Sequence, residues 1–204
     1  MSVTIRDYTE VDEQSWLRCR ALSFLGSSYY DDVKNRRTPF GGAALRLVAV
    51  QPRPDGMTTP GDDEVVGILD VELWEEDGRP VATIDTVAVN PDHQGNGVAT
   101  ALLATVLPQL TELDVTWLDA WTREDPEACG WYERHGFVVD ETYLHVYRGG
   151  DENVTDPLGD EGYAAPFGLG TCRRSPTRSC PSSRAPRHRK RRSHECDEGT
   201  AGQV

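Results

Sequence analysis

A glycine-rich turn between an apolar stretch and an amphipathic stretch is the part of this sequence best suited to bind an anion. Residues 84–89 are β-prone, and Pro91 ends this run. A helical pattern follows the turn at once, so backbone N–H groups and a positive helix dipole end converge on one point. Side chains at Gly95 and Gly97 would hold a phosphate away from the backbone or forbid the required φ values. The residues expected to bind the phosphate are Gln94, Gly95, Asn96, Gly97, Val98, Ala99 and Thr100.

The spacing of this turn excludes two common phosphate loops. The chain has no Gly-x4-Gly-Lys-Ser/Thr motif, so it offers neither the lysine nor the magnesium-binding hydroxyl of a P-loop. The pattern also differs from Gly-x-Gly-x-x-Gly, and no acidic residue ends a second strand about 20 residues later, as a dinucleotide-binding fold requires. What remains is Gln-x-x-Gly-x-Ala, from Gln94 to Ala99. This motif resembles the acyl-CoA pyrophosphate loop of the GNAT superfamily of N-acetyltransferases.

A second segment downstream strengthens this resemblance. Residues 128–137, Ala-Cys-Gly-Trp-Tyr-Glu-Arg-His-Gly-Phe, are similar to the family's Ala-x-x-x-Tyr-x-x-x-Gly-Phe segment. Asp125 suits the N-cap of a helix that begins at Pro126. Tyr132 alone would be interpreted as a core aromatic residue, but the order of the two motifs favours a functional role. The resemblance covers residues 1–148.

The resemblance implies acetyl transfer from acetyl-CoA to a primary amine, directly within a ternary complex and without a metal. Tyr132 then corresponds to the general acid that protonates the leaving CoA thiolate. The backbone groups of Val87 and Val89 would pair with the pantetheine arm of acetyl-CoA, and the Gln94 side chain would donate to a phosphate oxygen. Asp125 stands where the family often has asparagine, and its charge would alter contact with the CoA arm.

The sequence leaves two candidates for the general base, a side chain and a water molecule. In the family the base often lies on the fourth strand, at the positions of Thr83 and Asp85 here, and a threonine is no base at neutral pH. We expect Asp85 to share a strand face with Val87 and to act either as the base or as an anchor for the substrate ammonium. Asp70 and Glu72 also share a face that could hold a cation, but we interpret them as a solvent-facing edge.

These motifs require a mixed α/β domain to position them. The patterns predict α/β, and the resemblance implies the order β-α-α-β-β-β-α-β-α-β and a mixed, mostly antiparallel sheet with helices on both faces (α+β). Asp77-Gly78 predicts a hairpin turn between two long strands. The predicted strands are 3–6, 45–50, 65–74, 81–89, 115–122 and 137–147, and the predicted helices include 16–22, 29–37, 97–110 (ended by Pro108) and 126–135.

Charge is unevenly distributed along the chain. Residues 1–150 carry 26 acidic and 12 basic side chains, whereas residues 151–204 carry 8 and 9, and only two basic residues are lysines. Strong acidity with few lysines resembles proteins of halophilic organisms, which keep molar salt in the cytoplasm, where screening shortens charge repulsion. The acidic body of the protein, residues 1–150, disfavours nucleic acids and anionic membranes as partners. It suits a cationic amine, either a small molecule or a peptide.

The remaining composition predicts a soluble, reduced, cytoplasmic protein. No apolar run is long enough to span a membrane, and the first residues do not form a signal peptide. The five cysteines are sparse and lack CxxC spacing. Because members of the family often dimerise, the resemblance also implies a homodimer as one assembly.

The composition changes near residue 150. We predict a GNAT-like acetyltransferase domain at residues 1–149 and a tail at residues 150–204 that is Arg-rich in its second half. The tail has too little apolar surface to offset chain entropy, so we predict that it is disordered. Its basic run, residues 187–192, could instead contact nucleic acid or the acidic body. A change of reading frame near the end of the gene would also explain the switch to an Arg-rich composition. A zinc site is a further alternative, with ligands from Cys172, Cys180, His188, His194 and Cys196.

Two other functions compete with the enzyme. A non-catalytic acyl-CoA-binding sensor would keep the phosphate turn and lose the chemistry, and the presence of Tyr132 argues against it. An interaction protein would use the acidic body and the basic tail, and the turn would be incidental. The acceptor amine stays open, because the segment expected to form its pocket, residues 25–42, carries no signature.

Overall fold

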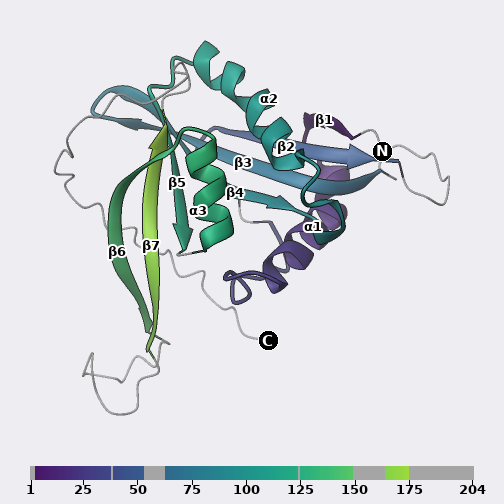
Figure 1. Ribbon diagram of the computed structural model, residues 1–204. Coiled ribbons are helices and arrows are strands. Elements are labelled where there is room, and N and C mark those ends of the chain that lie inside the picture. The colour runs from purple at the N-terminus through teal and green to yellow at the C-terminus, as the bar shows by residue number, and fades with distance from the viewer. Residues whose placement is uncertain (1–2, 38, 53–62, 124, 149–163, 175–204) are drawn as a thin grey trace, which may run out of the picture.

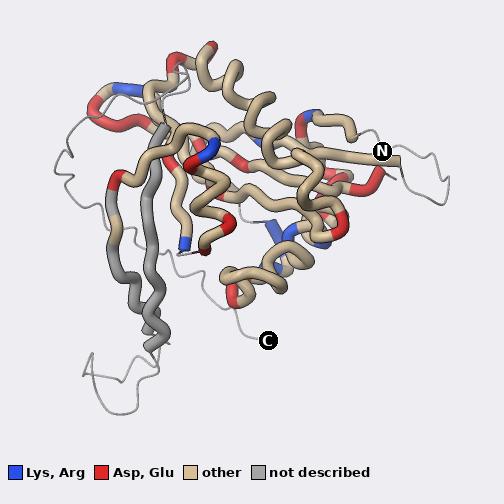
Figure 2. The backbone as a smooth tube through the Cα atoms, viewed as in Figure 1, with Lys and Arg blue, Asp and Glu red and all other residues tan. Residues whose placement is uncertain are grey.

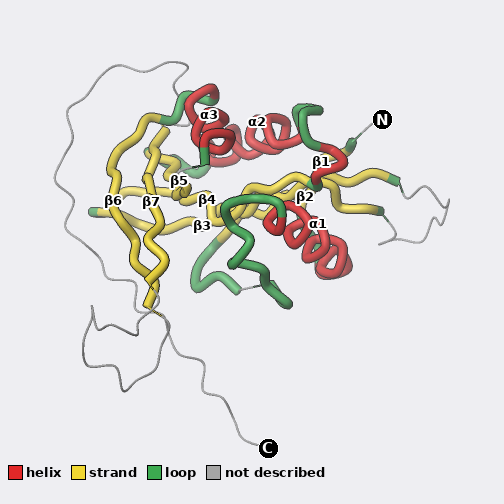
Figure 3. Tube along the Cα trace, turned by 60° about the horizontal axis from the view of Figure 1, so that its bottom comes forward, coloured by secondary structure: helices red, strands yellow, loops and turns green. Residues whose placement is uncertain are grey.

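A single seven-stranded sheet in the order β1-β2-β3-β4-β5-β7-β6 forms the centre of the computed structural model, which describes residues 3–37, 39–52, 63–123, 125–148 and 164–174. Neighbouring strands are antiparallel except β4 and β5. Helix α1 covers one face, and α2 and α3 cover the other (Figures 1 and 3). The predicted fold class is confirmed. The elements are β1 (Thr4–Asp7), α1 (Glu13–Leu25), β2 (Ala44–Gln51), β3 (Glu64–Glu76), β4 (Arg79–Val89), α2 (Val98–Glu112), β5 (Trp117–Arg123), α3 (Pro126–Arg134), β6 (Val138–Arg148) and β7 (Ala164–Arg174).

Each face of the sheet has its own apolar core. Leu102 and Val106 of α2 are fully buried in one cluster with Leu69 of β3. Trp16 of α1 is buried in a second cluster with Ile68, the preceding β3 residue. Successive side chains of a strand point to opposite faces, so a central strand buried on both sides is apolar at nearly every position. This explains why the predicted strand 65–74 lacks polar alternation over its first residues, 65–69.

The turn between β3 and β4 confirms the predicted hairpin. Asp77 and Gly78 both adopt positive φ angles, 50° and 74°. Two consecutive positive φ angles match the right-handed twist of the flanking strands, and Asp-Gly is one of the pairs that favour them. The register on both sides of the turn is therefore fixed close to the hairpin.

The prediction that Pro108 ends α2 is wrong. The helix continues through Pro108 to Glu112. Leu110 lies beyond the proline and is fully buried in the core on this face of the sheet. Burying a leucine side chain contributes about 1.5–3 kcal/mol, which is comparable to the cost of proline inside a helix.

The helix predicted at residues 29–37 is also absent, and this segment forms turns and bends. Its side chains bond to other elements: Asp32 pairs with Arg20 of α1 at 2.7 Å, and Asp31 pairs with Arg123 of β5 at 2.6 Å. Anchors on two separate elements favour an irregular connection over a regular helix.

Residues 164–174 form β7, so the prediction of disorder for the whole of residues 150–204 is wrong for this stretch. β7 lies between β5 and β6 and pairs with both. A strand with two partners is stabilised by backbone hydrogen bonds on both edges, which its weakly apolar side chains do not reveal. The basic run and most of the proposed zinc ligands lie outside the described residues, and the division into domain and tail stays a prediction.

Charged residues of the described segments lie mainly at turns and element ends. Figure 2 shows acidic residues at the β3–β4 hairpin and around the ends of α2 and α3. Within the described segments, no helix combines the length and apolar character needed to cross a membrane.

Candidate active site

The turn before α2 has the geometry of an anion site. Gly95 and Gly97 have φ angles of 73° and 76°, which confirms that the turn uses conformations that favour glycine. Gly97 caps α2 without a side-chain hydrogen bond, and the first turn of α2 has no acidic residue. The first N–H groups of a helix have no intrahelical acceptor and lie at the positive end of its dipole. The backbone from Val98 to Thr100 is therefore suited to bind an anion.

Side chains within the turn hold its shape. The Gln94 amide donates to the Val89 carbonyl oxygen at 3.1 Å. The Asn96 amide donates to the carbonyl oxygens of His93 and Gln94 at 3.2 and 3.3 Å. Donation from the Gln94 side chain to a phosphate stays a prediction, and one of the two amide hydrogens already binds the Val89 carbonyl. The first role of Gln94 in the structure is to fix the turn against the end of β4.

The position of α2 depends on Gly67, which sequence reasoning missed. A Cβ atom on Gly67 would lie 2.6 Å from Val98 Cγ1 and 3.2 Å from Leu102 Cδ1. Only glycine lets the first turns of α2 approach β3 this closely. Gly67 thus places the N-terminus of α2 at the end of β4.

The strands β4 and β5 diverge beside this turn. Their parallel register ends at Ile84 and Ala120, after which β5 continues with β7 as its partner. Figure 1 shows the arrows of β4 and β5 pointing in different directions. The second half of β4 therefore runs without β5 at its side.

A β-bulge marks the point of divergence. On β3, Asp70 faces Thr86 and the next residue faces Ile84, so Asp85 is an extra residue on β4. Ile84 and Val87 both pack in the core on the α2 side, which puts Asp85 and Thr86 on the α1 side. The prediction that Asp85 shares a face with Val87 is wrong, because the extra residue breaks the alternation.

Beyond the bulge, every second residue of β4 directs its backbone N–H and C=O groups away from β3. The Asn90 N–H donates to the Val66 carbonyl at 2.9 Å, and antiparallel pairing then directs Val87 and Val89 outward. The Val89 carbonyl accepts hydrogen bonds from Ser23 and Gln94, as an outward group can. The outward groups left for the predicted pairing are therefore those of Val87 and the N–H of Val89.

Asp125 caps α3 as predicted. Its Oδ1 accepts hydrogen bonds from the backbone N–H groups of Glu127 and Ala128 at 2.9 and 3.2 Å. Its Oδ2 accepts from the Ser28 hydroxyl at 3.3 Å. This carboxylate therefore fixes the start of α3 and ties it to the segment that follows α1.

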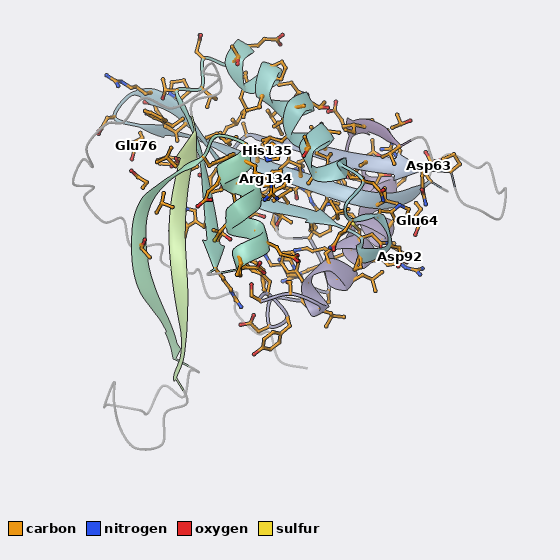
Figure 4. All side chains as sticks on the ribbon, in the orientation of Figure 1. Asp63, Glu64, Glu76, Asp92, Arg134 and His135 are labelled. Carbon is orange, nitrogen blue, oxygen red and sulfur yellow. The ribbon has the colours of Figure 1, made fainter. Side chains whose placement is uncertain are left out.

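Tyr132 lies on the buried face of α3 and is 6% exposed. Its ring makes edge contacts with Trp131 and Phe137, with centroids 5.1 Å away in both cases. At the end of α3, His135 Nδ1 donates to the Trp131 carbonyl at 2.7 Å, and Nε2 lies 3.0 Å from the Thr100 hydroxyl. Figure 4 shows His135 at the α3 end that lies nearest α2. The helix that carries Tyr132 is thus joined to the N-terminal end of α2.

The segment between α1 and β2 reaches the end of β5. The Tyr29 hydroxyl lies 3.0 Å from Thr122 Oγ1 and accepts the Arg123 N–H at 2.9 Å. The Arg123 side chain pairs with Asp31 and donates to the Ser28 carbonyl. These contacts hold the segment over the α1 side of the sheet, next to the divergence of β4 and β5.

Asp70 is buried on the same side of the sheet. Its side chain is 2% exposed, so the interpretation of Asp70 as part of a solvent-facing edge is wrong. The register places it between Arg46 of β2 and Thr86 of β4, and Arg37 contacts it from the segment before β2. Sequence reasoning assigned Arg37 no role, and only the fold reveals the contact.

The sheet thus places the glycine turn before α2 at the divergence of its parallel strand pair. Residues 14–137 match the acetyltransferase (GNAT) family. The chain belongs to the GNAT family, which confirms the resemblance of its two motifs.

Curated relatives share part of this sequence. A mycothiol acetyltransferase from Propionibacterium freudenreichii is 34% identical over 92 residues, which are 44% of this chain and 30% of that protein. One from Nocardiopsis dassonvillei is 28% identical over 139 residues, which are 64% and 41%. The chain therefore spans less than half the length of these relatives.

Solved structures confirm the fold. The ribosomal-protein-S18-alanine N-acetyltransferase of Escherichia coli has a TM-score of 0.59 at 16% identity, covering 90% of this chain and all of that one. Arabidopsis thaliana NAA60, in complex with a bisubstrate analogue, has a TM-score of 0.57 at 16% identity, covering 85% and 98%. A GNAT family acetyltransferase from Elizabethkingia anophelis with acetyl-CoA bound has a TM-score of 0.50 at 15% identity, covering 85% and 97%.

Proposed function

We propose that this chain is an N-acetyltransferase that transfers the acetyl group of acetyl-CoA to a primary amine by direct attack in a ternary complex. The observation that carries the proposal is the divergence of β4 from β5 beside the Gly95–Gly97 turn. A pyrophosphate bound at this turn would direct the pantetheine arm along β4. There the arm can pair, as a neighbouring strand would, with the outward backbone N–H and C=O groups of Val87 and with the N–H of Val89.

The residues around this path have distinct roles in the proposal. The CoA thiolate needs a proton as it leaves, and we assign it to the Tyr132 phenol. Asp85, on the α1 side of the bulge, serves either as the base or as the anchor of the substrate ammonium. Both oxygens of Asp125 accept hydrogen bonds from the protein, so its effect on the CoA arm would be electrostatic.

The acceptor belongs to the class of primary amines. The similar proteins are named for mycothiol acetylation, so the acceptor of that reaction is one candidate beside polyamines, amino acids, aminoglycosides and protein N-termini. The excess of acidic over basic side chains favours acceptors that carry positive charge.

The test combines binding with turnover. Calorimetry in high-salt buffer is expected to show micromolar-range binding of acetyl-CoA, and thiol release is expected with at least one amine from these classes. Binding without thiol release across the panel would contradict the enzyme and favour an acyl-CoA sensor. A folded protein that does not bind acetyl-CoA would contradict the anion site itself.

We further propose that this acidic protein is halophilic. Its net charge of −13 is self-repulsive in dilute buffer, and molar salt shortens the screening length to about 3 Å. The midpoint of thermal unfolding, followed by circular dichroism, is expected to rise as KCl increases from millimolar to molar concentration. A midpoint independent of KCl would count against the proposal.

A further inference from the structure

Asp70 is a buried carboxyl group with incomplete hydrogen bonding. Two nitrogens of Arg37 reach its Oδ2, at 3.3 and 3.4 Å. The other oxygen, Oδ1, has no hydrogen-bond partner among the described residues. A buried carboxylate oxygen without a donor costs free energy, and such groups are rare unless a ligand or a function explains them.

Asp12 is a second buried carboxylate with an arginine partner, and its contacts differ from those of Asp70. Arg6 donates from both terminal nitrogens to both oxygens of Asp12 at 2.7 Å, and Thr9 adds its N–H and hydroxyl. Burial alone would raise the pKa of Asp12, but these hydrogen bonds outweigh it and the pKa is lowered. Such short, two-sided contacts are typical of a structural ion pair. The Arg37 contact is longer and one-sided, so it leaves Asp70 only partly satisfied.

Charges from three directions face Asp70. Arg37 approaches from the segment before β2, Arg46 from β2 and Asp85 from β4. Burial, with a smaller contribution from the charge of Asp85, raises the pKa of Asp70 to about 6, although the two arginines act in the opposite direction. A carboxyl group with a pKa near 6 is mostly ionised at neutral pH and can still accept a proton.

The position of Asp70 fits the path of an acceptor. It lies opposite Thr86, whose hydroxyl donates to Asp85 Oδ2 at 2.9 Å. The two carboxyl groups thus lie together on the α1 side, where β4 leaves β5. Tyr132 belongs to the core on the opposite side of the sheet. An amine arriving from the α1 side and a thiolate leaving on the α2 side would meet separate proton-transfer groups.

We propose that Asp70 is the general base of the acetyl transfer and that Asp85 binds the ammonium group of the acceptor. This assignment rests on the proposed function and selects the anchoring role for Asp85. Arg37 is held with its guanidinium 4.3 Å from the centre of the Tyr8 ring and occupies Oδ2. Oδ1 is therefore the oxygen that receives the substrate proton.

The protons of this reaction balance. The ammonium gives one proton to Asp70, and the lone pair of the neutral amine forms the C–N bond to the thioester carbonyl carbon. The C–S bond breaks, and the CoA sulfur takes a proton from Tyr132. The nitrogen loses its second proton as the amide forms, which restores the phenol. Asp70 then releases its proton to solvent, so the products are an amide, free CoA thiol and one proton.

The test is the pH dependence of kcat/KM for thiol release, measured with the most active of spermidine, lysine, kanamycin and a peptide with a free N-terminal alanine. Wild-type kcat/KM is expected to fall below about pH 6, because protonated Asp70 no longer accepts a proton. Asp70→Asn is expected to lower kcat/KM at neutral pH by about 100-fold or more. It is also expected to abolish the fall of kcat/KM at acid pH, which is the acid limb of the pH profile.

Two variants shift the acid limb and leave Asp70 in place. Arg37→Gln removes a positive charge that favours the ionised form, so the limb is expected to move to higher pH. Asp85→Asn removes a neighbouring negative charge, so the limb is expected to move to lower pH while KM for the amine rises. A purely structural role for Asp70 would move the limb in neither variant.

Glu75→Gln is the matched control, because it makes the same chemical change at an exposed position of the same strand. It is expected to keep the wild-type limb. A folded Asp70→Asn protein with the wild-type rate and limb would overturn the assignment. If that variant does not fold, an unmoved limb in Arg37→Gln and Asp85→Asn would overturn it. Wild-type protein that binds acetyl-CoA but releases no thiol with any of these amines would refute the proposed function itself.

Discussion

Replacing Tyr132 by phenylalanine is expected to lower turnover by about 100-fold or more and to leave acetyl-CoA affinity within about two-fold of wild type. The substitution removes only the phenolic oxygen. The ring contacts with Trp131 and Phe137 remain, so α3 keeps its packing. Without the phenol, the CoA sulfur leaves as an unprotonated thiolate, and the barrier to breaking the C–S bond rises.

The measurement pairs single-turnover thiol release with calorimetry on the same preparation. Single-turnover rates report the chemical step, which separates a lost proton donor from slow product release. Circular dichroism checks that the variant is folded. If the single-turnover rate of Tyr132→Phe equals that of wild type, Tyr132 has no part in proton transfer.

The glycine turn before α2 and the capped helix α3 were predictable because their signals are local. Gly95 and Gly97 are required by the φ angles of their own positions, and Asp125 caps the helix that begins one residue later. Asp77-Gly78 likewise determines its own turn. In each case the physical cause lies within a few residues of the amino acid that reveals it, so the sequence alone suffices.

The α1 side of the candidate site was not predictable in the same way. The bulge at Asp85 depends on how β4 pairs with β3, and no residue in β4 signals the extra position. The burial of Asp70 depends on the segment before β2, which is held by contacts with β5 and α3 far along the chain. The backbone pairing that forms β7 is equally invisible in its side chains. These features arise from tertiary contacts, which local patterns do not encode.

The other large effect is expected for Gly97→Val, which should weaken acetyl-CoA binding by about 100-fold, or about 2.7 kcal/mol. Gly97 has a φ angle of 76°, and a β-branched residue is strongly disfavoured there. An added Cβ atom would meet no heavy atom within 4 Å, so the substitution acts through the backbone angle and not through a clash. The turn would relax to another φ, and its N–H groups would no longer converge. Losing one or two hydrogen bonds to a charged phosphate accounts for the expected change, at about 1.5–3 kcal/mol each.

Gly78→Val provides a control with the same local strain. Gly78 has a φ angle of 74° and the same open space around its Cα, but it lies in the β3–β4 hairpin. Both variants are expected to lose comparable stability in denaturant unfolding, about 1–2 kcal/mol, because both place a side chain at a left-handed φ. Calorimetry should then separate them, since only Gly97→Val changes the N-terminus of α2. Equal acetyl-CoA affinity in the two variants would mean that the turn before α2 does not bind the pyrophosphate, because strain alone is matched between them.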